Sequence, residues 1–300
     1  MKEFDIVIIG AGVAGMTAAI YGLRAKKSVL LIEKITTGGQ ILKTQQIENY
    51  PGFNSISGNE LAGSLRKQVE NLGGKIMIAE VLAVKKPDET FVIETDDEPI
   101  RAKAVIVANG SKERELGLAN EADFVSKGVS YCATCDGALY KDKLAAVYGG
   151  GNTAVYSVLY LSGICKKVFW LYRGDELKVE EQLLEKAKAA ENVEILPNSE
   201  VAELMGDDRL NGIKLENGQE IMLDALFVAS GRVADNDRFK ELVKLDDMGY
   251  IVADESCQTE TPGLFAAGDT RAKKLHQIVT ATADGAVAAS AAVEFLNKKA

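Results

Sequence analysis

The residues best suited to chemistry are two cysteines in the segment GVSYCATCDGALY, residues 128–140. Cys132 and Cys135 are separated by two residues, and Asp136 follows the second cysteine directly. Three interpretations fit such a pair: a zinc site, two inert thiols, or a disulfide that opens and closes during turnover. Zinc needs further Cys or His ligands at short spacing, but the two other cysteines and the single histidine of the chain are scattered. We therefore expect no metal site.

A redox disulfide is the best interpretation of this pair. The glycines at 128 and 137 predict a turn, and they place the cysteines beside the ionisable Asp136. A C-x-x-C arrangement lowers the pKa of one thiol, and a neighbouring carboxyl group can exchange protons with a departing thiolate. Cys132, Cys135 and Asp136 are therefore the predicted catalytic residues, and a chance pair of inert thiols remains the alternative.

A glycine fingerprint near the N-terminus predicts a nucleotide-binding unit. The apolar run FDIVIIG at 4–10 is typical of a strand buried on both faces, and residues 11–25 have helical spacing. Between them, residues 10–15 read G-x-G-x-x-G, the pattern that lets a pyrophosphate approach the backbone at a helix N-terminus. Glu33 ends the next strand, at the place where a carboxylate can accept hydrogen bonds from ribose hydroxyls.

A second fingerprint, GGGNTA at 149–154, has the G-x-G-x-x-A form. The spacing that leads from Gly10 to Glu33 leads from Gly149 to Tyr172, so no carboxylate occupies the ribose position. A pocket that binds no nucleotide is therefore a serious alternative, since the glycines indicate the fold and not the ligand. The residues of this possible second nucleotide site are Gly149, Gly151, Asn152, Thr153, Arg173 and Lys178.

The two halves of the chain also resemble each other beyond the fingerprints. Each contains hairpin-like segments and then an apolar strand that runs into a glycine, AVIVANG at 104–110 and ALFVASG at 225–231. The segment from Asp246 onward has no fingerprint, so we expect it to complete the first unit. The prediction is an α/β protein with two Rossmann-like nucleotide-binding domains of the three-layer ββα type, the second inserted in the first. The first domain comprises residues 1–113 and 246–300, and the inserted domain comprises residues 114–245.

Composition excludes several classes of partner. The formal net charge of −9 argues against a surface that binds nucleic acid. The uncharged run from Ile6 to Leu23 approaches the length of a membrane helix, but it contains four glycines and follows acidic residues, so we interpret it as folded core. Four cysteines without a targeting segment indicate a reducing compartment. We expect a cytoplasmic protein with no membrane contact.

Taken together, these motifs resemble the low-molecular-weight thioredoxin reductases, flavoproteins of the pyridine-nucleotide disulfide oxidoreductase type. The similarity extends over the whole chain and includes GGQI at 38–41, IENYPGF at 47–53, CATCDG at 132–137 and TPGLFAAGDT at 261–270. The resemblance implies FAD on the first unit, thioredoxin as partner, a homodimer, and a rotation of the inserted domain. The cofactor-binding residues that it implies are Gly10, Gly12, Ala14, Gly15, Glu33, Gly39, Gln40, Asn49, Gly110, Gly268, Asp269 and Gln277.

The same resemblance implies separate roles for the two sulfur atoms. Cys135 would lie nearer the flavin and receive electrons, Cys132 would attack the disulfide of thioredoxin, and Asp136 would donate and accept protons. The residues alone do not rank the two sulfurs. A non-catalytic flavin-binding redox sensor that keeps this fold is the alternative from a different functional class.

The electron donor is the point at which this chain departs from the family. Members that use NADPH carry a His-Arg-Arg run after the second strand of the inserted domain and a further arginine four residues on. The aligned residues here are Tyr172, Arg173, Gly174 and Lys178, so the paired guanidinium groups that suit a 2′-phosphate are missing. We expect reduced ferredoxin to be the donor, as in the similar ferredoxin-dependent flavin thioredoxin reductases, with NADPH or NADH as the alternative.

Overall fold

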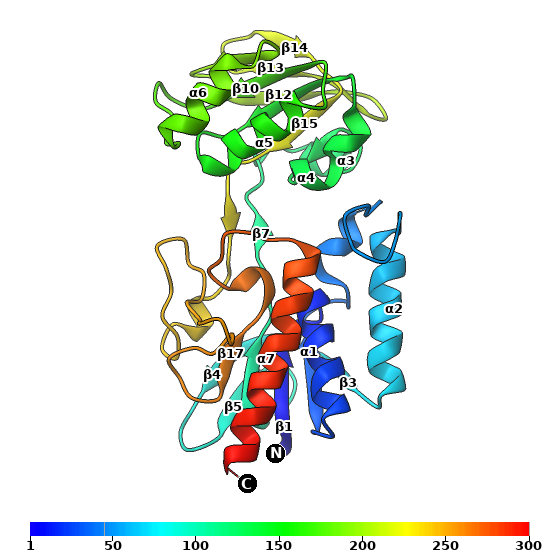
Figure 1. Cartoon of the computed structure of the whole chain (residues 1–300), viewed down its shortest axis with the longest axis vertical. Coiled ribbons are helices and arrows are strands. Elements are labelled where there is room, and N and C mark those ends of the chain that lie inside the picture. Colours follow the sequence, from blue (N-terminus) through cyan, green and yellow to red (C-terminus); the bar gives the residue numbers. More distant parts are fainter. Residues whose placement is uncertain (45, 300) are drawn as a thin grey trace. The chain divides into compact units, whose positions relative to one another are not determined.

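The computed structural model describes residues 1–44 and 46–299, so Gln45 and Ala300 lie outside it. The chain forms two compact units (Figure 1). Unit 1 comprises Met1–Lys112 and Val233–Ala300, and unit 2 comprises Glu113–Arg232. Two short strands at the unit boundaries, β7 (Lys112–Glu113) and β16 (Arg232–Val233), pair with each other.

Unit 1 is built on a seven-stranded sheet in the order β3-β2-β1-β6-β5-β4, with β17 also paired to β6. The pairs among β3, β2, β1, β6 and β17 are parallel, whereas β4, β5 and β6 form an antiparallel meander. The elements of this unit are β1 (Lys2–Ile9), α1 (Val13–Arg24), β2 (Val29–Glu33), η1 (Gly39–Lys43), α2 (Gly58–Asn71), β3 (Lys75–Ile78), β4 (Val81–Lys85), β5 (Phe91–Thr95), β6 (Ile100–Val107), η3 (Asp237–Phe239), β17 (Leu264–Ala266), η4 (Gly268–Thr270) and α7 (Ile278–Lys299).

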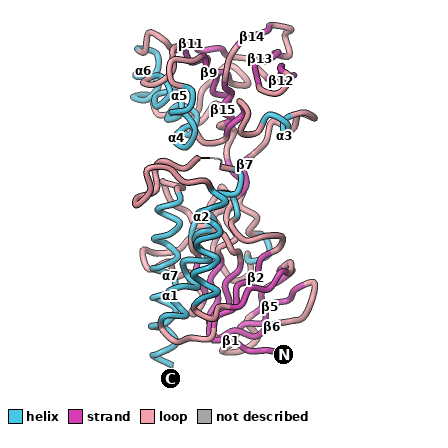
Figure 2. Tube along the Cα trace, turned by 90° about the vertical axis from the view of Figure 1, so that its right-hand side faces the viewer, coloured by secondary structure: helices cyan, strands magenta, loops and turns pink. Residues whose placement is uncertain are grey.

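The first strand is apolar throughout because both of its faces are buried. Ile6 and Ile8 belong to the core that α1 and α7 form on one side of the sheet. Val7 and Ile9 belong to a second core, on the side of the antiparallel meander. Figure 2 shows α1, α2 and α7 grouped beside the strands of this unit. The continuous apolar run therefore reflects a middle layer between helices and a meander.

Unit 2 repeats this arrangement. Its parallel sheet has the order β11-β10-β9-β15-β8, and β12, β13 and β14 form a separate antiparallel meander. The elements of this unit are α3 (Glu121–Phe124), β8 (Val129–Ser130), α4 (Ala133–Asp136), η2 (Gly137–Tyr140), β9 (Leu144–Tyr148), α5 (Asn152–Ser162), β10 (Lys167–Leu171), α6 (Glu181–Ala189), β11 (Val193–Leu196), β12 (Val201–Gly206), β13 (Leu210–Leu215), β14 (Glu220–Met222) and β15 (Ala225–Val228). Two Rossmann-like domains of an α/β protein, the predicted fold class, are confirmed.

The second boundary of the insertion differs from the one expected from the sequence. The expected inserted domain ran over residues 114–245, whereas unit 2 ends at Arg232. Phe239 and Val243 are buried, at 0% and 3% exposure, in the meander-side core of unit 1. Residues 233–245 therefore belong to unit 1, because their apolar side chains complete its core. The sequence places this boundary at Asp246 because no glycine fingerprint follows it, and that criterion does not indicate which core residues 233–245 join.

The C-terminal helix α7 is the one described helix that is long and apolar enough to cross a membrane by length and composition. Its Ala288, Ala289 and Ala292 are fully buried in the core that contains α1. Small residues on this face let the two helices pack closely. We therefore interpret α7 as a core helix of unit 1.

Candidate active site

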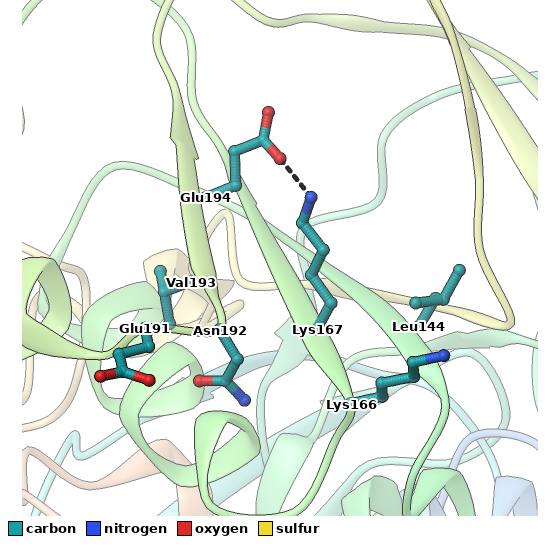
Figure 3. Close-up of a pocket in the computed structure, with 7 residues that line it drawn as sticks. All are labelled: Leu144, Lys166, Lys167, Glu191, Asn192, Val193 and Glu194. Atoms are coloured by element: carbon teal, nitrogen blue, oxygen red, sulfur yellow. Dashed lines mark ion pairs between the residues drawn. The ribbon is translucent and has the colours of Figure 1, made fainter.

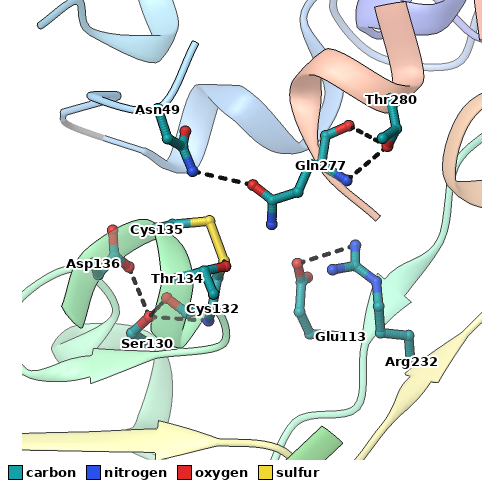
Figure 4. The surroundings of a disulfide bond; sticks show 10 residues. All are labelled: Asn49, Glu113, Ser130, Cys132, Thr134, Cys135, Asp136, Arg232, Gln277 and Thr280. Carbon is teal, nitrogen blue, oxygen red and sulfur yellow. Dashed lines mark hydrogen bonds and ion pairs between the residues drawn. A yellow bond between two sulfur atoms is a disulfide. The ribbon is translucent and has the colours of Figure 1, made fainter. Parts of the chain in front are cut away.

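The cysteine pair lies directly after β8, in unit 2. The sulfur atoms of Cys132 and Cys135 are bonded to each other, and their α carbons are 5.3 Å apart (Figure 4). Cys132 is the extended residue that precedes the single helical turn α4, and its carbonyl accepts a hydrogen bond of 3.1 Å from the backbone N–H of Asp136. This turn brings the two side chains to the same side, so the C-x-x-C motif closes without a long-range contact.

The carboxyl group of Asp136 is held by a serine that the sequence motifs did not indicate. The Ser130 hydroxyl donates to Asp136 Oδ2 at 2.6 Å, and the Ser130 Oγ accepts from the backbone N–H of Cys132 at 3.1 Å. Burial raises the pKa of Asp136, and the hydrogen bond from Ser130 opposes that rise. The disulfide is thus accompanied by a carboxyl group suited to carry a proton. The sequence feature that could have indicated this hydrogen bond is the serine two residues before Cys132.

The first glycine loop has the shape that a dinucleotide requires. A Cβ atom on Gly15 would lie 1.8 Å from the carbonyl oxygen of Gly10, so the third glycine allows the helix to pack on the turn. A Cβ atom on Gly12 would meet nothing within 4 Å, which leaves open space over the second glycine. Glu33 lies beside this loop, where its Oε2 accepts the backbone N–H of Ala11 at 2.9 Å.

Further predicted cofactor-binding residues lie around the same loop. Gly39 approaches Gly12, because a Cβ atom on Gly39 would be 3.3 Å from the Gly12 Cα. A Cβ atom on Gly268 would be 2.8 Å from the Cβ of Ala14, so the η4 turn that carries Asp269 packs on the start of α1. These contacts bring the two ends of unit 1 together, as the prediction of a split domain requires.

The last predicted contact residues lie just before α7, in the loop around Asn49, in η1 and after β6. Asn49 donates from its side-chain amide to Gln277 Oε1 at 3.1 Å (Figure 4). Gly110 follows β6 with a positive φ of 70°. Gln40 donates from Nε2 to the carbonyl of Ser111 at 3.2 Å. These contacts lie within unit 1.

A buried ionic cluster, which no motif in the sequence indicated, supports the η4 turn. Asp284, on α7, accepts the backbone N–H of Gly268 at 3.0 Å. It also pairs with Arg271 at 3.0 Å and with Lys273 at 2.9 Å, and these three side chains are only 10–12% exposed. Buried charges are retained when they are paired in this way. The cluster fixes the backbone beside Asp269, and an aspartate in an alanine-rich helix was the signal for it.

The second glycine loop has the same backbone design as the first. A Cβ atom on Gly149 would lie 2.4 Å from the carbonyl oxygen of Ala229, whereas a Cβ atom on Gly151 would meet nothing within 4 Å. α5 begins after Gly151, so Asn152 and Thr153 form its first turn. The indole N–H of Trp170 donates to the carbonyl of Gly149 at 2.8 Å.

The side chains around the second loop differ from those of a phosphate site. Arg173 is 78% exposed and lies 3.8 Å from Glu200, and Tyr172 is buried in the ribose position. The backbone of Lys178 runs beside Gly151 and donates its N–H to the carbonyl of Gly150 at 2.9 Å.

Glu180 adds a carboxylate at the N-terminus of α5. Its backbone N–H donates to Asn152 Oδ1 at 3.1 Å, and its own Oε1 lies 3.5 Å from Asn152 Nδ2. A carboxylate at this end of a helix occupies the position that favours an anion.

A shallow groove lies at the opposite, amino-terminal ends of the unit 2 strands (Figure 3). Its Lys167 and Glu194 form an ion pair of 2.6 Å, and the Asn192 side chain donates to the carbonyls of Ser162 and Cys165. These polar groups serve contacts within the protein, so we assign no function to the groove.

Comparison with known proteins places this chain in a family. Residues 4–285 match the family model of the pyridine nucleotide-disulphide oxidoreductases. The chain is 40% identical to a thioredoxin reductase of Listeria monocytogenes over 303 residues, which cover 99% of this chain and 95% of that protein. It is similar to the crystal structure of thioredoxin reductase from Streptococcus pyogenes, with 37% identity, 99% coverage of both chains and a TM-score of 0.94. A ferredoxin-flavin thioredoxin reductase from Clostridium acetobutylicum is 31% identical, with 99% coverage of both chains and a TM-score of 0.56.

The chain therefore belongs to the pyridine nucleotide-disulphide oxidoreductase family. It is an enzyme, a flavoprotein disulfide oxidoreductase, and the resemblance to low-molecular-weight thioredoxin reductases is confirmed over its whole length. FAD is the cofactor that this family implies, and unit 1 fits it. Gly12 leaves open space for a pyrophosphate, and Gln40 Oε1 is buried without a hydrogen-bond partner among the described residues, which suits a polar ligand.

Proposed function

We propose that this enzyme reduces the disulfide of thioredoxin through Cys132 and Cys135. The observation that carries the proposal is the disulfide next to a partly buried carboxyl group, Asp136, whose pKa is raised by burial. A dithiol can pass its electron pair to another disulfide by thiol-disulfide exchange, and a carboxyl group of raised pKa can carry the protons near neutral pH. The 40% identical Listeria relative named as a thioredoxin reductase supports the same substrate.

The exchange with thioredoxin balances in two steps. In the reduced enzyme, the Cys132 thiolate attacks one thioredoxin sulfur, which forms a mixed disulfide, and the departing thioredoxin thiolate takes the proton of Asp136. The Asp136 carboxylate then accepts the proton of Cys135. The Cys135 thiolate attacks the Cys132 sulfur, and the second thioredoxin thiolate leaves and takes that proton from Asp136. The products are dithiol thioredoxin and the Cys132–Cys135 disulfide.

Flavin, when bound, supplies the electron pair that restores the dithiol. The residues of unit 1 that we propose to hold it share the space around the first glycine loop and the η4 turn. Gly12 would admit the pyrophosphate, Glu33 would accept hydrogen bonds from a ribose, and Asp269 and Gln277 would contact the remainder. Gly10, Ala14, Gly15, Gly39, Gln40, Asn49, Gly110 and Gly268 complete this proposed set.

Single replacements of the two cysteines test this function. We expect Cys132→Ser and Cys135→Ser each to abolish thioredoxin reduction while the protein retains its yellow flavin colour. Cys165→Ala is the matched control, because Cys165 is a buried free thiol in the same unit. Full activity in Cys132→Ser would contradict the assignment of the attacking sulfur. Retained flavin with no turnover in the unaltered enzyme would indicate the redox sensor.

For the electron donor, we propose reduced ferredoxin. The cations that would hold a 2′-phosphate are reduced to the exposed Arg173 and Lys178, and Glu180 adds a carboxylate beside the helix N-terminus where a pyrophosphate would lie. Charge-assisted contacts are worth about 1.5 to 3 kcal/mol each, so losing one or two weakens NADPH binding by roughly tenfold to several hundredfold. NADH binding is not strengthened in return, because Tyr172 and not a carboxylate stands at the ribose position. A flavin accepts single electrons in turn, so a one-electron carrier needs no nucleotide pocket.

Anaerobic titration of the flavin separates the donors. We expect reduced ferredoxin to bleach the flavin absorbance rapidly, and micromolar NADPH or NADH to bleach it slowly. Rapid, stoichiometric bleaching by NADPH would establish the alternative donor, whose contacts would be Gly149, Gly151, Asn152, Thr153, Arg173 and Lys178. We further propose a cytoplasmic location and a homodimer, and size measurement by light scattering would test the dimer.

A further inference from the structure

We propose that Ser130 is a positioning residue that couples Asp136 to the backbone of Cys132 and keeps Asp136 ready to act as a base. This inference rests on the proposed proton-transfer role of Asp136. It concerns a side chain that lies before the C-x-x-C motif and outside it. Two hydrogen bonds converge on the hydroxyl group of this one side chain (Figure 4).

The Ser130 hydroxyl has a defined orientation. A serine hydroxyl has one hydrogen to donate, and its oxygen can accept. The 3.1 Å bond from the Cys132 N–H uses the oxygen as an acceptor, so the hydrogen is free to point to Asp136 Oδ2, 2.6 Å away. The carbonyl of Cys132 is a longer alternative acceptor at 3.4 Å. The short contact to the carboxyl group is therefore the favoured direction of the hydroxyl.

The sheet holds Ser130 in this position. Ser130 is 4% exposed and pairs with Phe227 in the parallel ladder of β8 and β15. A side chain at the end of a paired strand has little freedom, so the hydroxyl is already in place before the carboxyl group ionises. Asp136 lies six residues later, after the turn of α4. The serine thus connects the rigid sheet to the short helix that carries the chemistry.

The direction of the effect follows from the charge on Asp136. A donated hydrogen bond stabilises the carboxylate more than the protonated acid, so it opposes the rise in pKa that burial causes. Among the described residues, the ionisable groups around this segment include Tyr140, whose pKa Asp136 helps to raise, and the ion pair of Glu113 and Arg232 drawn with the disulfide in Figure 4. Tyr140 lies on η2, and the Tyr160 ring on α5 faces Gly137.

Charged groups act on Tyr140 from other elements. Arg209 precedes β13 and Asp224 precedes β15, and both influence Tyr140, as does Asp136 itself. Ser130 is the group that lowers the pKa of Asp136, against burial as the cause that raises it. Removing the hydroxyl should therefore shift the titration of Asp136 toward higher pH and leave the disulfide itself intact.

The test compares Ser130→Ala with Ser130→Thr in the complete holoenzyme. Infrared difference spectra against pH follow the carboxylic C=O band of Asp136, which is identified as the band that Asp136→Asn removes. We expect Ser130→Ala to move this titration, and the acidic limb of the turnover profile, to higher pH by about one to two units. Ser130→Thr retains a hydroxyl and should titrate as the unaltered enzyme does.

Ser157→Ala is the matched control, because its hydroxyl donates to the carbonyl of Thr153 within its own helix. An unchanged C=O titration in Ser130→Ala would overturn the inference. If Ser130→Ala fails to fold, Ser130→Val replaces it, since Val and Thr differ only in the hydroxyl. The proposed role of Asp136 has a separate test: thioredoxin reduction at the unaltered rate in Asp136→Asn would contradict it.

Discussion

The parallel strands of the two units follow the same order. The units differ in the segment that comes after one pair of equivalent strands, β17 in unit 1 and β8 in unit 2. In unit 1 the order is β3-β2-β1-β6 with β17 beside β6, and in unit 2 it is β11-β10-β9-β15-β8. β17 leads into the η4 turn with Asp269, whereas β8 leads into the disulfide and Asp136. The carboxyl end of a parallel strand presents loops to ligands. One such position in the fold thus carries a proposed cofactor contact in unit 1 and the proposed redox chemistry in unit 2.

The two glycine loops differ in the segment of chain that pairs with each of them. Gly38 lies beside Gly12 in unit 1 and donates its N–H to the carbonyl of Ala11, as Lys178 lies beside Gly151 and bonds Gly150 in unit 2. The segment beside the first loop continues as Gly39 and Gln40, and the segment beside the second loop leads to Glu180. The matching backbones therefore carry different side chains beside the two loops, and we propose that this difference affects the binding of an anion.

Apart from the two cysteines, the largest effect should come from the carboxyl group that follows β8. Asp136→Asn removes a proton carrier, and general acid-base catalysis contributes about 10²- to 10⁴-fold, so thioredoxin turnover should fall by that order. Steady-state assays with saturating donor measure it. Asp208→Asn, an exposed carboxylate in the turn after β12, is the control and should retain activity. Loss of flavin in Asp136→Asn would instead indicate a structural role.

A pair of glycine substitutions compares the two loops directly. Gly12→Ala and Gly151→Ala each place a methyl group in open space on backbone that alanine can adopt. We expect Gly12→Ala to weaken FAD binding by roughly tenfold to a hundredfold, because the methyl group meets the pyrophosphate at a cost of about 1 to 3 kcal/mol. Gly151→Ala should leave ferredoxin-driven turnover unchanged. An equal loss in both variants would show that both loops hold a required nucleotide.

A smaller effect should follow from removing the carboxylate at the second loop. Glu180→Gln takes a negative charge from an exposed helix N-terminus, where it is worth about 0.3 to 1 kcal/mol, so NADPH should bind roughly two- to fivefold more tightly. Calorimetric titration measures this change. Glu191→Gln, which lines the groove at the opposite ends of the strands, is the control. Weaker binding in Glu180→Gln would show that Glu180 helps to hold a nucleotide.

The last effect concerns stability and not turnover, and it lies at the start of the first strand in each unit. Burial opposes the charge of Asp5, but hydrogen bonds from Lys103 and Ser28 outweigh it and hold its pKa at about 2, below its usual 3.8. The stabilisation is present above about pH 4 and is lost as the pH falls toward 2. After solvent screening, Asp5→Asn should lower the free energy of unfolding by about 1 kcal/mol at pH 7.

Urea unfolding of unaltered protein and Asp5→Asn at pH 7 and near pH 2 would measure this difference. Leu144 corresponds to Asp5 when the two fingerprints are aligned on Gly10 and Gly149, and its N–H is tied to Asp224 Oδ2 at 2.9 Å. Hydrogen exchange in β9 should therefore be unaffected. A difference that persists near pH 2 would show that the carboxylate charge is not its cause.

The sequence by itself determined the elements whose signals are local. The apolar run at 4–10, the spacing of Gly10, Gly12 and Gly15, and the return of that pattern at 149–154 each depend on neighbouring residues, so they predicted the strands, helices and loops correctly. The C-x-x-C motif closes within one helical turn, so the disulfide that the sequence favoured over inert thiols needs no contact from a distant part of the chain.

The tertiary structure alone decided the features that depend on contacts between distant residues. Residues 233–245 belong to unit 1 because Phe239 fills a core built by strands far away in the chain. Asp284 lies 16 residues after Gly268, and Glu180 lies 28 residues after Asn152, so folding was needed to bring each pair together. Burial, which raises the pKa of Asp136, is likewise a property of the packed sheet. Spacing predicts a local hydrogen bond, but a shared core and a desolvated carboxyl group exist only once the layers have packed.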